Sequence, residues 1–167
     1  MGRKRLSDCD KIKLIESKGA KSMNIPSIVK ALTNEFNTND PFQLAASLGV
    51  KVLKLPLGNL KGFYKCIEQI KFIFINSNLK DDEQKIVCAH ELGHAIMHSK
   101  VNCCFLHNFT FQCTSKIEIE ANRFCAYLLI TDEMIKDYEG LTYSQISQAT
   151  YIPLKIVELR QAQEKMF

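Results

Sequence analysis

The sequence predicts one α+β domain: a small antiparallel sheet, a helix that carries His-Glu-Leu-Gly-His, and then further helices. Three observations support this. The chain of 167 residues has the length of one ordinary domain, which buries about 70% of its unfolded surface and needs no disulfide or metal to form a core. Short runs rich in β-branched and aromatic residues precede residue 77. Beyond that point, apolar residues recur mainly at helical spacing.

Two helices are expected before the sheet. Residues 24–37 place apolar side chains at helical spacing, with Pro26 in the first turn. A second helix, at residues 40–48, begins at a cap from Asp40 or Asn39. A glycine directly follows it, which is a typical helix end.

Three strands follow, at residues 50–55, 60–67 and 70–76. Only Glu68-Gln69 separates the last two, so they form an antiparallel hairpin. The next helix, at residues 81–98, has three acids in its first turn, where the helix dipole favours negative charge.

The cap of that helix is expected from Ser77 or Asn78. Residues 101–113 are expected to be irregular or a short strand, and a helix with a clear apolar stripe follows at residues 115–130. Thr131-Asp132 begins a short helix that ends near a glycine.

Domain boundaries follow from composition. Residues 1–22 carry seven basic and three acidic side chains, so the whole net charge of +4 lies there. We expect this segment to be a flexible or non-native tail ahead of a domain at 23–140. Residues 141–167 should then form a helical pair, with a break at 151–153, packed on that domain. Because 23–167 is neutral, it offers no basic field for nucleic acid.

Seven cysteines, an odd number, occur mostly in apolar stretches, and no apolar run reaches membrane-spanning length. No secretory signal is visible, so we expect reduced thiols and a cytoplasmic location without membrane association. Cys103, Cys104 and Cys113 are less favoured as a soft metal site than as ordinary buried or loop thiols. The oligomeric state is left open.

The motif His90-Glu91-Leu92-Gly93-His94 predicts a metal site. Residues four apart share one face of a helix, so His90 and His94 can bind one ion while Glu91 projects beside them. This arrangement supplies two neutral nitrogen ligands and a general base to a zinc hydrolase. Two histidines that merely share a buried helix face are the less favoured alternative.

A catalytic zinc needs a third protein ligand. His98 does not qualify, because eight residues of continuous helix separate it from His90 by about 12 Å; we expect it beside the site as a supporting or core residue. Glu118 and Glu120 are the nearer candidates, and a remote ligand also remains open. The two glutamates occupy different helix faces because they are two residues apart.

Glu118 is the favoured ligand. It shares a helix face with Asn122, whose amide can hold a ligand histidine. Its alternative role is a capping box with Ser115. Glu120 is spaced to form an exposed pair with Arg123 instead.

Several blocks together resemble the ImmA/IrrE metallopeptidases, over residues 23–135. These blocks are Thr38-Asn39-Asp40-Pro41-Phe42, Gly62-Phe63-Tyr64, His90-Glu91-Leu92-Gly93-His94 with His98, and Glu118-x-x-Ala121-Asn122-x-Phe124 with Leu128-Leu129. One departure is Leu129-Ile130-Thr131, where the family commonly has Met-Pro after the paired leucines.

The resemblance implies a small zincin-like domain with one Zn²⁺ and cytosolic action. His90, His94 and Glu118 match the family's ligand positions, and Glu91 matches its catalytic glutamate. The family includes proteins of phages and integrative elements that cut a helix-turn-helix repressor. The predicted function is therefore a zinc-dependent, site-specific endopeptidase acting on such a repressor.

The predicted chemistry uses Glu91 to take a proton from water and pass it to the leaving amine. Zinc is preferred, although histidine and carboxylate ligands also suit other metals. Tyr64, His98 or Tyr143 could stabilise the oxyanion, although core packing is the favoured role for each. The strand at 60–67 could hold an extended substrate by adding it to the sheet.

A competing interpretation is a metal-binding transcriptional regulator. Residues 142–160 resemble a helix-turn-helix, with Ile146, Ile152 and Val157 at its packing positions. DNA binding is not favoured, because the second helix offers only Lys155 and Arg160 as basic groups.

Overall fold

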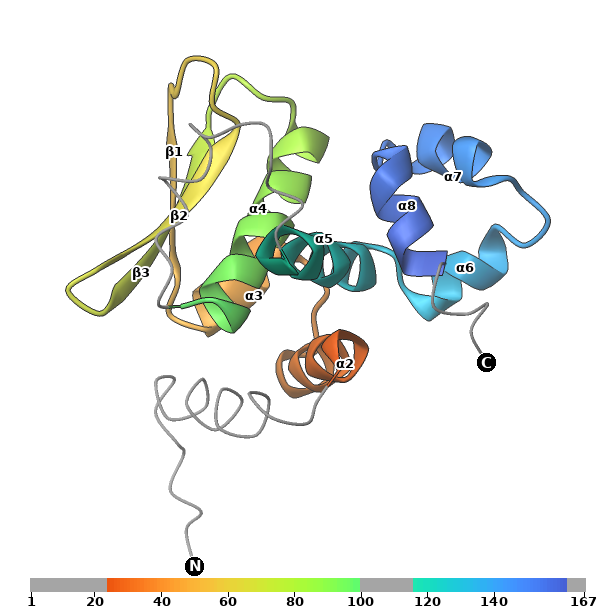
Figure 1. Cartoon of the computed structure of the whole chain (residues 1–167), viewed down its shortest axis with the longest axis horizontal. Helices are drawn as coiled ribbons and strands as arrows, with labels where there is room; N and C mark the ends of the chain where they lie inside the picture. Colours follow the sequence, from red (N-terminus) through yellow and green to blue (C-terminus); the bar gives the residue numbers. More distant parts are fainter. Residues whose placement is uncertain (1–23, 100–115, 162–167) are drawn as a thin grey trace, which may run out of the picture.

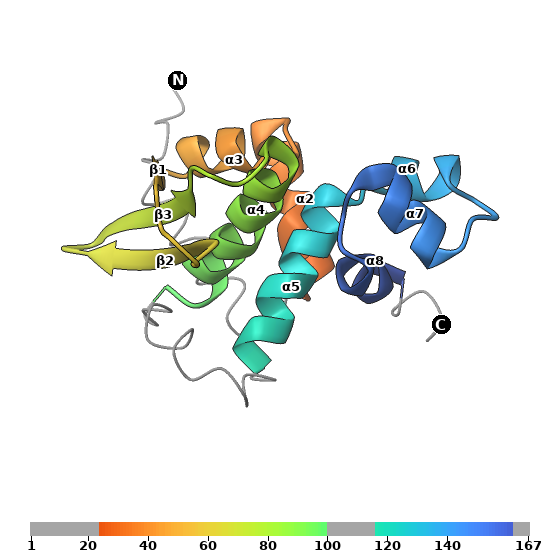
Figure 2. The same cartoon turned by 90° about the horizontal axis from the view of Figure 1, so that it is seen from above.

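The computed structural model describes residues 24–99 and 116–161, which contain three strands and seven helices. A small sheet covers one side of helix α4 (Asp81–Met97), and helix α5 (Lys116–Leu129) packs on the other (Figures 1 and 2). The predicted segment at 101–113, with its three cysteines, and residues 1–23 lie outside the described ranges. The α+β class predicted from the sequence is confirmed.

The sheet is mixed, so the prediction of an antiparallel sheet was wrong. Its order is β1 (Lys51–Leu55), β3 (Ile70–Asn76), β2 (Gly62–Ile67). β2 and β3 form the expected antiparallel hairpin, but β1 pairs parallel with β3. The chain crosses from β1 to the far side of β3 before β2 begins, and hydrophobic spacing carries no information about that crossing. β2 is therefore an edge strand.

The hairpin turn is at the predicted place. Glu68 and Gln69 both have positive φ, 48° and 65°, as a two-residue turn that matches strand twist requires. Alternation along the strands separates two faces. Tyr64, Ile73 and Ile75 are buried against the helices, while aromatic residues line the opposite face.

The two N-terminal helices form as predicted. α2 (Ile25–Phe36) begins at Asn24, whose side chain accepts from the Ser27 N–H, and α3 (Pro41–Ser47) begins at Asp40. The Asp40 carboxylate accepts from two backbone N–H groups, at 3.0 and 2.9 Å. These bonds satisfy donors that a helix start would otherwise leave unpaired.

Helix α4 begins at Asp81 as predicted, but its cap is a different residue. Its N-cap is Lys80, not Ser77 or Asn78. The Lys80 N–H donates to the Glu83 carboxylate at 3.4 Å, and Asp81 and Asp82 complete an acidic first turn as predicted. Most of the helix from residue 88 to residue 96 is buried, because it lies between the sheet and α5.

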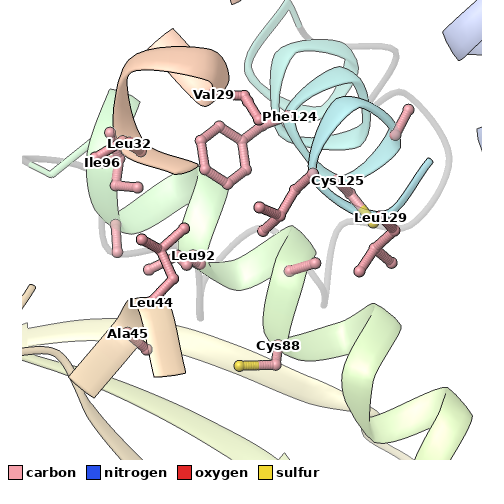
Figure 3. Packing of buried hydrophobic residues seen from close by; sticks show 14 of the residues in the cluster. Val29, Leu32, Leu44, Ala45, Cys88, Leu92, Ile96, Phe124, Cys125 and Leu129 are labelled. Atoms are coloured by element: carbon pink, nitrogen blue, oxygen red, sulfur yellow. The ribbon is translucent and has the colours of Figure 1, made fainter. Parts of the chain in front are cut away.

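The core joins α4 and α5 to the two N-terminal helices (Figure 3). Phe124 of α5 is fully buried and lies near Val29 of α2 and Leu92 of α4. Leu44 and Ala45 bring α3 onto α4. Burying large apolar side chains contributes about 1.5–3 kcal/mol each to folding. This core therefore fixes the position of α5 relative to α4.

Three shorter helices complete the described chain: α6 (Asp132–Asp137), α7 (Tyr143–Thr150) and α8 (Leu154–Gln161). The α7–α8 break occurs as predicted, with Tyr151 in the left-handed region at φ 56°. α8 packs on α5 through a buried side that includes Ile156, Val157 and Arg160.

The Arg160 side chain is therefore not exposed at the surface. From the sequence it counted as one of the two basic groups that the second helix could offer to DNA. Its side chain is buried, stacks over Tyr127 at 4.4 Å and donates from Nε to the Ile130 carbonyl at 3.0 Å. It also pairs with Asp132. On the exposed side of α8, Lys155 is then the remaining basic residue within 153–160, which weakens the DNA-binding interpretation further.

No helix in the described part of the chain combines the length and apolarity needed to cross a bilayer.

Candidate metal centre

Three side chains from two helices converge at the α4–α5 interface. His90 and His94 lie one turn apart on α4, and their Nε2 atoms are 3.1 Å apart. Glu118, in the first turn of α5, places one carboxylate oxygen 3.4 Å from His90 Nε2 and the other 3.3 Å from His94 Nε2. The three donors therefore face one point.

The donors are close enough together to bind one metal ion. Ligands about 2.0–2.1 Å from a zinc ion at tetrahedral angles stand about 3.3–3.4 Å from one another. The two Nε2 atoms, 3.1 Å apart, are close to that edge length, and the two oxygens of the Glu118 carboxylate lie 3.4 Å from His90 Nε2 and 3.3 Å from His94 Nε2 respectively. Within the described residues, His90, His94 and Glu118 are also the group of potential ligands close enough to hold one ion.

Small residues bring the two helices close enough for this contact. Gly93, inside the histidine motif, packs directly on Ala121 of α5. A Cβ added at Gly93 would stand 3.1 Å from Phe124 Cβ and 3.2 Å from Ala121 Cα. A larger residue at Gly93 would therefore separate the helices and withdraw Glu118 from the two imidazoles.

Asn122 orients one of the histidines. Its Oδ1 lies 3.0 Å from His90 Nδ1, so the amide oxygen accepts a hydrogen bond from the Nδ1–H group. That bond leaves the Nε2 lone pair directed toward His94 and Glu118, the tautomer a metal ligand needs. His94 is 1% exposed, and its Nδ1 has no hydrogen-bond partner among the described residues.

The electrostatics of the three donors are coupled. Hydrogen bonds from His90 and His94 hold the pKa of Glu118 well below its ordinary value of 4.5. Burial disfavours the charged form of His90, but Glu118, Glu91 and Asn122 outweigh it, so the pKa of His90 is raised above 6.5. Without a metal, the cluster thus favours a protonated histidine beside an ionised carboxylate.

Glu91 lies next to this cluster without belonging to it. It is 2% exposed, and its Oε2 atom has no hydrogen-bond partner among the described residues. Glu91 and His90 both line a pocket of about 330 Å³ between the start of β2, α4, α5 and the start of α8. A buried, unpaired carboxylate oxygen beside a pocket is an arrangement expected for a proton acceptor.

Residues 45–160 match the family model of peptidase family M78, described as the IrrE N-terminal-like domain. The match spans more than half of the chain and contains the whole His-Glu-Leu-Gly-His motif together with Glu118. The chain belongs to the ImmA/IrrE family of metallopeptidases.

Two relatives support this assignment. The chain is 34% identical over 143 residues to "Uncharacterized immunity region protein 2" of Bacillus phage phi105, covering 84% of this chain and 90% of the relative. It is 28% identical over 159 residues to "Metallopeptidase ImmA" of Bacillus subtilis strain 168, covering 91% and 89%. Membership in a metallopeptidase family implies a metal ion, and the His-His-Glu cluster of this ImmA/IrrE chain fits one.

His98 and Glu120 form a separate contact next to the cluster. His98 caps the end of α4, and its Nε2 lies 3.1 Å from Glu120 Oε2. Glu120 also lies 3.7 Å from Lys116 Nζ. The expected exposed Glu120–Arg123 pair is not among the ion pairs of the described residues, because Glu120 turns toward His98 on α4 and is only 25% exposed.

The two tyrosines considered for the oxyanion lie in different places in this ImmA/IrrE chain. Tyr64 is fully buried on β2, and its hydroxyl donates to the Ser99 carbonyl at 3.2 Å. Tyr143 is the first residue of α7 and is half-buried. Neither lines the pocket that Glu91 and His90 share, so a role for either at the oxyanion stays a prediction.

Asn76, which the sequence did not single out, and Gly62, for which it indicated no role, both shape the surroundings of this site. Asn76, at the end of β3, is 4% exposed and donates to the carbonyls of Gly58 and Leu60 at 2.9 and 2.8 Å. It thereby holds the loop that leads into Gly62, where a Cβ would stand 2.5 Å from Val87 Cγ1 of α4. The sequence signal for Asn76 was a polar residue at the end of an apolar strand. The close approach of α4 to Gly62 had no sequence signal other than the glycine itself.

Proposed function

We propose that the protein is a zinc-dependent endopeptidase that cuts one protein substrate at one or a few sites. The observation that carries this proposal is the convergence of His90, His94 and Glu118 within reach of one ion, with the Glu91 Oε2 atom unpaired beside them. Three protein ligands leave a fourth position for water, which is the pattern of catalytic rather than structural zinc.

His90, His94 and Glu118 would hold the ion. Two imidazole nitrogens and one carboxylate suit zinc, and the two nitrogen ligands argue for it over metals that prefer octahedral oxygen ligands. When bound, zinc lowers the pKa of a water molecule and polarises the scissile carbonyl.

Glu91 would perform the proton transfers. Its Oε2 is free to accept a proton from the attacking water and later to deliver it to the leaving amine. Asn122 would keep His90 in the binding tautomer throughout.

The edge strand β2 would hold the substrate backbone. It borders the sheet on the side away from β1, so one row of its backbone groups has no partner strand within the described sheet. An extended peptide can pair with such an edge. Because Gly62 at its start also lines the pocket beside Glu91, a peptide paired there would pass close to the proposed catalytic group.

We infer that the substrate is a helix-turn-helix repressor of a phage or mobile element, cut in an exposed segment in the cytoplasm. The support is family membership together with the names of the two relatives, an immunity region protein and ImmA. A strand-pairing site accepts extended backbone, which favours a flexible repressor segment over a folded one.

The test is to co-express the full chain with the repressor encoded beside its gene, and to follow repressor fragments. Discrete fragments are expected with the wild type and none with Glu91→Gln, which keeps size and polarity but cannot accept the proton. Removing a general base lowers the rate by at least ~10²-fold. An intact repressor together with general digestion of casein would show an unspecific peptidase instead.

A further inference from the structure

The pocket beside Glu91 has a wall made by the start of α8. We call it the α8 pocket, because Lys155 and Ile156 in the first turn of α8, with Pro153 directly before it, line the pocket together with α4 and α5. On α4 it is lined by Ile86 and Val87, one turn before His90 and Glu91. The α8 pocket thus includes the proposed catalytic carboxylate in its lining, whereas Glu118 is not part of that lining.

We propose that the α8 pocket receives the apolar side chain of the substrate residue that directly follows the scissile bond. This inference rests on the proposed endopeptidase function and adds the chemical class of residue that the enzyme selects. It also assigns α8 a role as a specificity element of the peptidase.

The pocket walls favour an apolar occupant. Ile86, Val87 and Ile156 supply aliphatic surface from two helices. Cys125 adds a thiol from α5, and burial raises its pKa to about 12, so it stays protonated and behaves as a small apolar group. A polar side chain placed against these aliphatic walls would lose its hydration, and the polar groups of the lining, His90, Glu91 and Asn122, lie at the end of the pocket where the proposed reaction takes place.

The two lysines of the pocket do not change this preference. Lys61 and Lys155 are both exposed, so their charged ends can stay hydrated while their stems border the opening. They therefore offer no desolvated cation that would draw a carboxylate into the interior.

The position of Glu91 is the basis for assigning the pocket to the leaving-group side of the scissile bond. A group that delivers a proton to the leaving amine must stand beside the residue that carries that amine. Glu91 and His90 line the α8 pocket, whereas His94 and Glu118 do not. The side chain closest to the pocket is then that of the residue after the cut.

The experiment is to digest an unbiased peptide library with the zinc-loaded full chain and to sequence the new amino termini. We expect leucine, phenylalanine and similar residues directly after the cut, at least ~10-fold enriched over serine and glutamate. Val87→Ala and Ile156→Ala, on two different helices, should both shift the preference toward larger side chains. Glu158→Gln, on the exposed face of α8 and outside the pocket, is the matched control and should leave the profile unchanged.

A binding measurement separates this inference from the proposed function. Dipeptide hydroxamates that differ in one side chain are titrated against the zinc-loaded chain, and no cleavage is needed. Tighter binding of the apolar members without any library cleavage would support the pocket and reject the peptidase. Cleavage with no apolar preference after the cut, or a profile that neither pocket variant alters, would overturn the pocket assignment and leave the peptidase intact. Hydroxamates that bind without regard to the side chain would also overturn it.

Discussion

At the scale of single residues, the choice of third ligand depends on the directions in which the side chains of Glu118 and Glu120 point. Glu118 approaches both His90 and His94, whereas Glu120 approaches His98. The two acids are two residues apart, so they diverge around the helix axis. The capping-box role for Glu118 involves Ser115, which lies outside the described residues.

Metal content should follow this difference. The purified protein is expected to hold about one zinc per chain, and His90→Ala or His94→Ala should lose it. Glu118→Gln should weaken zinc binding much more than the matched variant Glu120→Gln, because only the Glu118 carboxylate faces both imidazoles. Elemental analysis after dialysis measures this; equal zinc in the two glutamine variants would contradict the assignment of Glu118.

The same residues predict opposite pH trends for the two forms of the protein. In the metal-free chain, the raised pKa of His90 contributes stability below pH 6.5 that is lost as pH rises through the shifted value. The lowered pKa of Glu118 contributes stability above pH 4.5 that is lost in stronger acid.

The cluster should therefore stabilise the metal-free protein most between pH 4.5 and 6.5. Zinc retention should instead rise with pH, because protons compete for His90 and His94. Urea denaturation and zinc titration across pH 4 to 9 test both trends. A His90→Gln variant is the control for the stability window, and zinc binding that is independent of pH would contradict the ligand set.

At the scale of helices, the distance between α4 and α5 decides whether the site exists. Gly93 and Ala121 are the small residues at the crossing, and each belongs to one of the two sequence blocks that carry the site residues. Helices approach closely where side chains are small. The role of Gly93 is thus to let Glu118 reach across from α5.

Gly93→Ala should weaken zinc binding by about 10-fold or more, the scale for displaced supporting groups at metal sites. The added methyl would press on Phe124 Cβ and on the Ala121 backbone, and neither can swing aside. Replacing glycine within a helix also contributes about 1 kcal/mol of helix propensity, which offsets part of the strain. The Kd for zinc should therefore change more than the thermal unfolding midpoint does. Unchanged affinity would show that α5 can shift without moving Glu118.

At the scale of the whole molecule, Arg160 connects α8 to the end of α5 and the start of α6. It contacts Tyr127, the Ile130 carbonyl and Asp132 from a buried position. The same helix supplies the wall of the α8 pocket through its first turn. Docking of α8 should therefore matter both to stability and to the shape of the proposed substrate site.

Arg160→Met keeps an apolar stem but removes the hydrogen bonds, and should destabilise the protein by about 1.5–3 kcal/mol, the scale of bonds to a charged group. Chemical denaturation measures the change. Lys136→Met, at an exposed position of α6, is the matched control and should stay within about 0.5 kcal/mol of the wild type. Equal stability of the two variants would mean that α8 docks without Arg160.

Local patterns were enough to predict much of this protein. The helices α2, α4 and α7, the β2–β3 hairpin and the break before α8 each follow from spacing, caps or turns within a few residues. The proposal of His90, His94 and Glu91 also needed only the four-residue period of a helix, because that period places side chains without reference to the rest of the chain.

Only the tertiary structure shows the features that involve segments far apart in the sequence. The parallel pairing of β1 with β3, the burial of Arg160 and the pocket between α4 and α8 arise from packing partners up to tens of residues away. The 3.3–3.4 Å approach of Glu118 to the histidines is of the same kind. A sequence pattern states which side of an element is apolar, but not which other element covers it. That choice follows from how all the apolar faces are buried together, and it created both the three-donor cluster and the pocket beside it.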